Sequence, residues 1–220
     1  MVGLKIGGKY MIEPKEADRI IKSTFRVKRR DTLPYTGWLR STRKDLAQIY
    51  NTLGYKIGAE VGVQSGKHAK LLFNNVEGLK LFCIDPWTAY NKMTQEKVDR
   101  TFNSCVSRLK GCNVEYIKKT SMDAVGDIPD RSLDFVYIDG LHEFDPVMTD
   151  LIYWSKKVRF GGIVAGHDYY EFYQGGIVKA VNAYTHAHNI HDWYITTGDA
   201  DKYPSFFWVQ KKEYQQGYSF

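Results

Sequence analysis

The sequence is poor in cysteine and proline, and it has no long apolar run. It contains three cysteines and six prolines in 220 residues. The cysteine count is odd and no two cysteines form a C-x-x-C pair, which indicates reduced thiols in a reducing compartment. No apolar stretch approaches the ~18 residues that would span a bilayer. Residues Met1 to Met11 also lack the apolar core of a signal peptide, so we expect a cytoplasmic protein without a membrane partner.

Internal repeats and low-complexity tracts are absent as well, which argues against a solenoid or a disordered linker. Hydrophobic residues make up 43 % of the chain, enough to fill a core. The length fits one α/β domain with short additions.

Acidic residues are scarce between Lys22 and Lys44, and this segment carries the positive charge of the chain. The whole chain has a net charge of +6, whereas this segment has eight basic side chains and a single acid, Asp31. Such a local basic segment is either a solvated helix end and loop, or a surface for an anionic substrate or a nucleic-acid backbone.

The first 55 residues predict an N-terminal helical extension, residues 1–55. Apolar residues recur at helical spacing from Glu13 to Phe25. A second helix is expected from Thr42 to Leu53, with Ser41 as its N-cap. Between the two helices, Asp31 to Gly37 is predicted to be a loop because it contains proline and glycine.

From Tyr55 onward, short apolar runs alternate with helix-length segments, which is typical of βα units around a mostly parallel sheet. Strands are predicted at 57–63, 79–84, 114–117, 133–138, 162–165, 193–197 and 206–210. Helices are predicted at 67–75, 95–109, 121–128, 146–158 and 176–189. We therefore expect residues 56–220 to form a Rossmann-like, doubly wound α/β domain, with a mostly parallel seven-stranded sheet and an antiparallel last strand.

The first strand leads into the turn Glu60-Val61-Gly62-Val63-Gln64-Ser65-Gly66, which opens a helix. Its glycines allow a sharp turn and a ligand close to the backbone. The spacing matches neither a dinucleotide fingerprint nor a P-loop, which favours a ligand without a pyrophosphate. Glu60 suits a ligand that carries an amino group and a sulfonium charge. The alternative is a tight turn without a ligand.

The second strand ends in Asp85-Pro86-Trp87. Ligands of open parallel sheets bind at the carboxyl ends of the strands, where Asp85 can accept hydrogen bonds from ribose hydroxyls. Asp85 is otherwise a turn or cap residue. Trp87 either borders an adenine ring or packs in the core.

The fourth and fifth strands end in Asp139, His142, His167 and Asp168. In a parallel sheet these side chains converge beside the glycine turn, where charged groups rarely gather without a task. His167 or His142 can act as a general base towards a hydroxyl acceptor. Asp139 and Asp168 can instead hold a divalent cation that lowers the pKa of the acceptor. Each histidine taken alone also fits a structural role.

Taken together, the segments "EVGVQSGK", "CIDPW", "DFVYIDGLHEFDPVMTDLIYW" and "GGIVAGHDYY" resemble class I S-adenosylmethionine-dependent methyltransferases. More narrowly, they resemble the bacterial macrocin-type sugar O-methyltransferases. The resemblance implies that Glu60, Gly62, Val63 and Gly66 border the methionine part of the cofactor. It implies that Asp85 binds the ribose, that Ser121 and Met122 lie near the adenine, and that Asp139 lies at the reaction edge. Residues 1–55 would form a substrate cap or lid.

Metal-dependent relatives place an Asp-Asp or Asp-Asn pair after the fifth strand, where this chain has His167-Asp168. The resemblance thus implies a Mg²⁺ site at Asp139, His167 and Asp168, with one hard oxygen ligand replaced. The sequence predicts an O-methyltransferase for a small-molecule or sugar hydroxyl, with Asp139, His142 and His167 as catalytic residues. The alternatives are an RNA methyltransferase that uses the basic segment, and a cofactor-binding module without catalysis. Homo-oligomerisation is left open.

Overall fold

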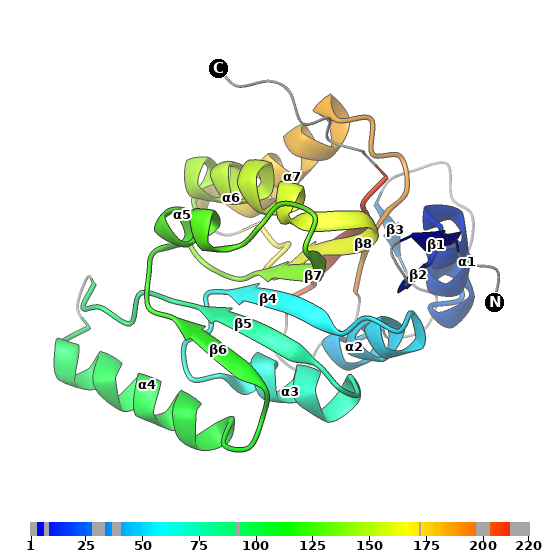
Figure 1. Ribbon diagram of the computed structural model, residues 1–220. Coiled ribbons are helices and arrows are strands. Elements are labelled where there is room, and N and C mark those ends of the chain that lie inside the picture. The colour runs from blue at the N-terminus through cyan, green and yellow to red at the C-terminus, as the bar shows by residue number, and fades with distance from the viewer. Residues whose placement is uncertain are drawn as a thin grey trace.

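The computed structural model describes residues 4–6, 9–27, 34–36, 41–90, 93–171, 173–196 and 203–211. An eight-stranded sheet with the order β3-β9-β10-β8-β7-β4-β5-β6 forms its centre, with helices on both faces (Figure 1). The strands of this sheet are β3 (Tyr35–Thr36), β4 (Ile57–Val61), β5 (Lys80–Ile84), β6 (Val114–Ile117), β7 (Leu133–Ile138), β8 (Val158–Gly166), β9 (Trp193–Ile195) and β10 (Phe206–Val209).

The helices alternate with the strands, as the sequence pattern predicts. They are α1 (Pro14–Thr24), α2 (Arg43–Thr52), α3 (Lys67–Asn75), α4 (Gln95–Arg108), α5 (Ser121–Ala124), α6 (Phe144–Lys157) and α7 (Gly176–Ala187). Short 3₁₀ turns follow α5 at Val125–Asp127 and precede α7 at Tyr173–Gly175. The predicted boundaries are accurate to within four residues, and the largest differences are the start of β8 and the end of α5.

The sheet is mostly parallel. Strand β4 pairs in parallel with β5 and β7, and the pairs β5–β6 and β7–β8 are parallel too. Strand β10 runs antiparallel to both β8 and β9. The predicted mostly parallel sheet of seven strands with an antiparallel last strand is therefore confirmed, and β3 adds an eighth strand at its edge. Because the connections cross over the sheet, the carboxyl ends of the parallel strands meet at one edge.

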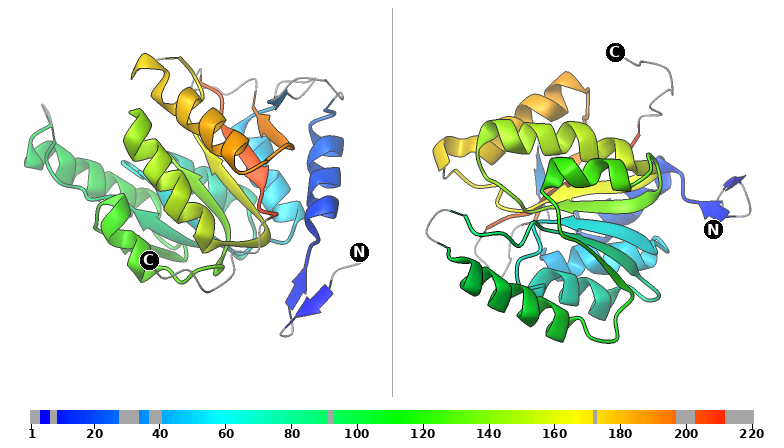
Figure 2. Two further views of the ribbon diagram at one scale, coloured as in Figure 1. Left: turned by 90° about the horizontal axis from the view of Figure 1, so that it is seen from above. Right: turned by 60° about the vertical axis from the view of Figure 1, so that its left-hand side comes forward.

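The N-terminal region contains strands that the sequence analysis missed. Residues Tyr35–Thr36, predicted as loop, add an eighth strand beside β9. A hairpin of β1 (Leu4–Ile6) and β2 (Lys9–Met11) precedes α1 and projects from the body (Figure 2). Strands of two or three residues are too short for a detectable alternation of apolar side chains.

Helix α2 begins one residue later than predicted. Thr42, not Ser41, is its N-cap: the Thr42 side chain accepts from the Asp45 amide, and the Asp45 carboxylate accepts from the Thr42 amide. This reciprocal capping box satisfies two backbone donors at once. The Thr42–Asp45 spacing was present in the sequence and decides the cap.

Two apolar cores lie on opposite faces of the sheet. One lies under α1, α2, α3 and α4, and the other under α5, α6 and α7 (Figures 1 and 2). Helices α1 and α2 bury Ala17, Ile21 and Tyr50 in the first core, so this part of residues 1–55 shares the core of the sheet. The role of residues 1–55 as a cap stays a prediction. Among the helices described, none is long and apolar enough for a membrane span.

Candidate functional site

The backbone ladder aligns the ends of four parallel strands at one edge. Gly62 follows β4, Asp139 follows β7 and His167 follows β8, and each continues the hydrogen bonding of the sheet by one residue. The bonds run from the Gly62 amide to Ile84, from the Asp139 amide to Val61, and from the His167 amide to Ile138, at 2.7–3.0 Å. The sheet therefore brings the predicted turn, Asp85, Asp139 and His167 together at one edge.

The glycines of the turn are required by the chain itself. Gly62 has φ = +89°, and a side chain there would clash with the carbonyl oxygen of Asp139. Gly66 has φ = +71°, and a Cβ there would lie 2.8 Å from the sulfur of Cys105 on α4. A positive φ alone favours glycine, and at both positions a side chain would also clash with a neighbouring atom. Their proximity to a cofactor stays a prediction.

Glu60 is buried at the end of β4, and its Oε2 accepts no hydrogen bond from the described residues. Burial raises the pKa of Glu60 to about 8, against the attraction of Arg43 on α2. The Nδ1 of His68 lies 3.5 Å from Glu60 Oε1, and the His68 ring packs on Tyr137 at 3.9 Å between centroids. At neutral pH the carboxyl group is thus held mainly in its neutral form, which a nearby cation would ionise.

Sequence reasoning did not single out His68 or Arg43 as part of the site. His68 lies on the buried stripe of α3 with Ala69 and Leu72, where the periodicity predicts apolar residues. A polar residue on such a stripe is a detectable signal. Arg43 reaches this region only because α2 packs beside α3, which the local pattern does not reveal.

Asp85 links two loops at the predicted ribose position. Its carboxylate accepts the amide of Gln64 and the amide of Trp87, each at 2.9 Å. The Trp87 indole donates to the Gln64 carbonyl and packs against Phe102 and Tyr116. Each carboxylate oxygen of Asp85 keeps a second lone pair for a ligand hydroxyl. Trp87 is only 5 % exposed, so packing accounts for most of its surface.

Ser121 and Met122, the residues predicted near the adenine, lie at the start of α5. The Ser121 hydroxyl donates to Asp150 of α6 and accepts from the indole of Trp154. Burial raises the pKa of Asp150 to about 6, against the hydrogen bond from Ser121. Met122 is exposed. Ser121 is thus held by two side chains of α6, whereas Met122 lies at the surface.

At the ends of β7 and β8, one carboxylate joins two imidazoles. His167 Nδ1 lies 2.9 Å from Asp168 Oδ1, and His142 Nε2 lies 3.0 Å from Asp168 Oδ2. Asp139 is the next neighbour, with 3.9 Å between its Oδ1 and His167 Nδ1. All four predicted reaction-edge residues are therefore brought together, and Asp168 is their centre.

Electrostatics tie these groups to one another. Burial alone would raise the pKa of Asp168, but the hydrogen bonds with His142 and His167 hold it well below its usual range. The hydrogen bond with Asp168 raises the pKa of His142, although burial lowers it. Burial raises the pKa of Asp139, and the charge of His167 opposes this. The two hydrogen bonds thus favour the anionic form of Asp168, which can stabilise a protonated imidazole.

A small cavity of about 10 Å³ lies beside this group. It is lined by nine residues, Ile138, Asp139, Gly140, Leu141, His142, Val147, His167, Ile177 and Phe206. The volume is about that of one oxygen-sized group. His167 Nε2 is buried and has no hydrogen-bond partner within the described ranges. Since Asp168 accepts from Nδ1, Nε2 carries the lone pair that a base needs.

The predicted cation ligands are only partly those that the structure groups. Within the described residues, Asp139, His142 and Asp168 offer ligand atoms that lie within 4.8 Å of one another. His142 therefore stands where the prediction had His167. Two carboxylates and an imidazole suit a borderline divalent ion better than Mg²⁺, which prefers oxygen ligands. Both Asp168 oxygens already face imidazole nitrogens, so an ion would have to replace those contacts.

Comparison with known proteins agrees with this architecture. A protein of Acanthamoeba polyphaga mimivirus, described as uncharacterized protein R132, is 30 % identical over 128 residues. That match covers 56 % of this chain and 56 % of the viral protein, so the chain spans about half the length of this relative.

Two solved structures share the fold over most of the chain. The O-methyltransferase of Bacillus cereus, in complex with SAH, has a TM-score of 0.57 at 12 % identity and covers 90 % of this chain and 92 % of its own. The O-methyltransferase TomG of Streptomyces achromogenes, involved in tomaymycin synthesis and in complex with SAM, has a TM-score of 0.56 at 16 % identity. It covers 90 % of this chain and 99 % of its own.

The family match spans the strands and turns that build the site. Residues 59–169, from the end of β4 to just past Asp168, match a family described as methyltransferase domain. The chain therefore belongs to the methyltransferase domain family, and its sheet has the class I fold of S-adenosylmethionine-dependent methyltransferases.

Proposed function

We propose that this protein transfers the methyl group of S-adenosylmethionine to a hydroxyl oxygen of a small-molecule or sugar acceptor. The observation that supports this best is the His167–Asp168–His142 group at the carboxyl edge, next to the turn that follows β4. A hydroxyl acceptor must lose a proton as its oxygen is methylated. A buried histidine oriented by a carboxylate is suited to take that proton.

The residues around the turn fit the cofactor. S-adenosylmethionine, when bound, supplies an electrophilic methyl group on a positively charged sulfur. Glu60 offers a buried carboxyl oxygen without a partner among the described residues, which suits the cationic amino or sulfonium group. Asp85 keeps acceptor capacity for ribose hydroxyls. Ser121 and Met122 would border the adenine, and the αL turn at Gly66 would place Lys67 and α3 behind the ligand.

His167 would act as the base. Its Nδ1–H is directed to Asp168, and its Nε2 would accept the proton of the acceptor hydroxyl in the small cavity. Asp168 would stabilise the imidazolium that results. His142, with a more exposed side chain, would border the acceptor and hold the second oxygen of Asp168. Alignment of the two reactants supplies much of the acceleration in a displacement at carbon.

A divalent cation is an alternative means of removing the proton from the acceptor hydroxyl. Asp139, His142 and Asp168 would hold it, and it would lower the pKa of the acceptor hydroxyl. Turnover that is lost with EDTA and restored by Mn²⁺ or Mg²⁺ would favour the cation. Unchanged turnover in EDTA would favour His167.

The test is calorimetric titration of the protein with S-adenosylhomocysteine. We expect micromolar binding, weakened at least ~10-fold in Asp85→Ala because two ribose hydrogen bonds are lost. Asp99→Ala, an exposed acid on α4, is the matched control and should bind like the parent. Since Asp85 also links Gln64 and Trp87, thermal unfolding of both variants separates a loss of binding from a loss of fold.

Two results would contradict the proposal. Absence of S-adenosylhomocysteine binding to the parent protein would exclude the cofactor. Binding without methyl transfer to any hydroxyl acceptor, but with transfer to RNA, would favour the nucleic-acid alternative.

A further inference from the structure

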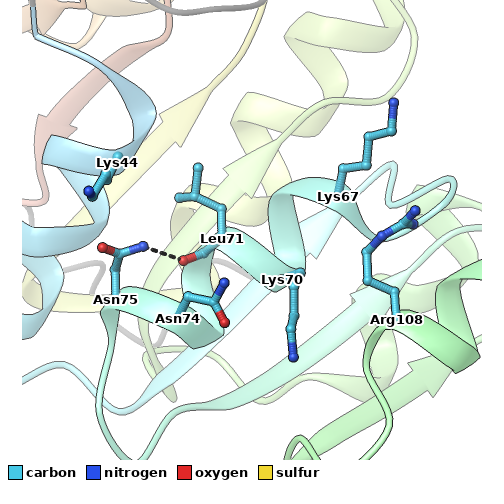
Figure 3. Close-up of a pocket in the computed structure, with 7 residues that line it drawn as sticks. All are labelled: Lys44, Lys67, Lys70, Leu71, Asn74, Asn75 and Arg108. Atoms are coloured by element: carbon cyan, nitrogen blue, oxygen red, sulfur yellow. Dashed lines mark hydrogen bonds between the residues drawn. The ribbon is translucent and has the colours of Figure 1, made fainter.

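A second concave surface lies away from the reaction edge, along the outer face of α3. It is a groove of about 520 Å³ between α2, α3 and α4 (Figure 3). We call it the basic groove and define it by its seven lining residues, Lys44, Lys67, Lys70, Leu71, Asn74, Asn75 and Arg108. None of them lines the small cavity at Asp139 and His167.

The basic groove concentrates positive charge without any internal compensation. Four of its seven residues are cationic and none is acidic. Within the described part of the chain, Lys44, Lys67, Lys70 and Arg108 make no ion pair, whereas Lys157 and Lys211 do. Lys67 and Lys70 also lie three residues apart on one helix, where like charges repel. An anion in the groove would relieve this repulsion.

The cations come from three helices and line the same groove. In Figure 3, Lys44 of α2 lies at one end of the groove, and Lys67 and Arg108 lie at the other, with α3 between them. From Lys67 to Asn74 the helix rises by about 10 Å. Charges spread over this length suit a ligand with more than one anionic group.

Arg108 is held in place before any ligand arrives. Its guanidinium donates to the carbonyl oxygen of Ser65, in the turn that precedes α3. One N–H is used for this bond, and a guanidinium has five. A planar group that is already oriented loses little entropy when it binds an oxyanion. The exposed amide of Asn74 adds a neutral donor to the same lining.

We propose that the basic groove binds a small molecule that carries two or more phosphate groups. Its volume lies within the range of small-molecule sites, roughly 300–1,000 Å³. Its lining contains no aromatic ring, and proteins that hold single-stranded nucleic acid stack bases on such rings. The chemistry is thus that of phosphate recognition without base recognition, which favours a polyphosphate over an RNA strand.

The proposal for this groove does not depend on the proposed methyl transfer, although the groove adjoins the same turn. Lys67 follows Gly66 directly, and Arg108 holds the carbonyl of Ser65. An anion bound by both side chains would contact the end of the segment that we assign to the cofactor. The binding test below needs neither the cofactor nor an acceptor, so its failure would leave the proposed function untouched.

The experiment is calorimetric titration of the full chain with inorganic tripolyphosphate at low ionic strength. We expect saturable binding with one site, weakened at least ~10-fold in the double variant Lys67→Gln/Lys70→Gln, because charge-assisted hydrogen bonds are lost. Lys15→Gln/Lys97→Gln is the matched control: it removes the same charge from exposed positions on α1 and α4 that do not line the groove. It should bind like the parent.

Three outcomes would overturn the proposal. The first is no binding of tripolyphosphate to the parent protein. The second is an equal loss in the groove variant and in the control, which would mean diffuse attraction by net charge. The third is a short oligouridylate that binds more tightly than tripolyphosphate and loses its affinity in the groove variant, which would identify a nucleic-acid surface.

Discussion

The reaction edge and the basic groove are both rich in charged side chains, but within the described part of the chain these side chains are paired at the edge and unpaired in the groove. At the reaction edge, one anion, Asp168, is buried and contacts His142 and His167 within 3.0 Å. In the groove, four cations lie around an open volume, and none has an anionic partner among the described residues. Charges of the first kind are satisfied by the chain, and charges of the second kind are left for a ligand.

The difference follows from burial. An ionised group in a low-dielectric interior needs a partner within the fold, because desolvation costs far more than a surface contact returns. A lysine at the surface keeps its hydration and needs none. Buried and paired groups at a sheet edge can therefore be oriented for chemistry, whereas exposed and unpaired groups of one sign create an electrostatic field that attracts an oppositely charged molecule.

The largest effect that would test this comparison is on turnover. In His167→Ala we expect methyl transfer to fall about 10²- to 10⁴-fold, because the general base is removed. The affinity for S-adenosylhomocysteine should stay unchanged in the same variant, as measured by calorimetry.

His142→Ala is the matched variant, since it removes the other imidazole that contacts Asp168. We expect a loss of only about tenfold, because His142 orients Asp168 and takes no proton in our assignment. Full turnover in both variants would exclude histidine base catalysis, and full turnover in His142→Ala would also count against a cation held by His142.

The next effect is on stability and tests how densely the reaction edge is packed. Gly62→Ala should destabilise the protein by at least ~3 kcal/mol, because φ is positive and the new methyl group meets the Asp139 carbonyl. Gly54→Ala should cost about 1 kcal/mol, because φ is also positive but no atom lies within 4 Å of the added carbon. Denaturant unfolding measures both. Equal costs would show that the close approach of β7 to the turn is not the constraint.

The smallest effect concerns Glu60 and pH. Its pKa is about 8 in the folded protein against 4.5 as the ordinary value, so between these values the folded state holds a proton that the unfolded state has lost. Stability from this group therefore falls as pH rises through that window. In Glu60→Gln the fall should disappear, and the melting temperature relative to the parent should rise by ~3 °C or more between about pH 5 and pH 8.

Glu77→Gln, which changes an exposed glutamate after α3, is the matched control for the loss of one carboxylate. A Glu60→Gln protein whose melting temperature follows that of the parent at every pH would mean that Glu60 is ionised and partnered. The reaction edge would then hold a second ionised carboxylate, at Glu60, beside Asp168.

Much of the fold could be read from the sequence because its signals are local. The predicted strand at Leu133–Ile138 and helix at Lys67–Asn75 have the bounds that the structure shows. Both are long enough for a clear period. The strand at Tyr35–Thr36 and the hairpin before α1 were missed, since such short segments form only through pairing with a distant or adjoining strand. Thr42 rather than Ser41 caps α2, because the Asp45 side chain completes a capping box with Thr42.

The candidate site was predictable in its membership and not in its contacts. Asp139, His142, His167 and Asp168 could be named because parallel strands must end at a common edge. The contacts depend on the backbone geometry after β8. This geometry lets Asp168 contact both imidazoles. It also places His142, and not His167, with Asp139 and Asp168 in the group that has cation-ligand spacing among the described residues. Asp168 has φ = +57°, a conformation that no periodic pattern predicts.

The sequence by itself determined the order of βα units, the mostly parallel sheet and the polar residues at the strand ends, because periodicity and turn chemistry act over a few neighbouring residues. Only the tertiary structure decided that Gly62 must be glycine, since the atom that forbids a side chain belongs to Asp139. Only the packing of α2, α3 and α4 gathers Lys44, Lys67 and Arg108 into one groove. These residues are far apart in the chain, and contacts of that range are set by how whole helices pack on the sheet.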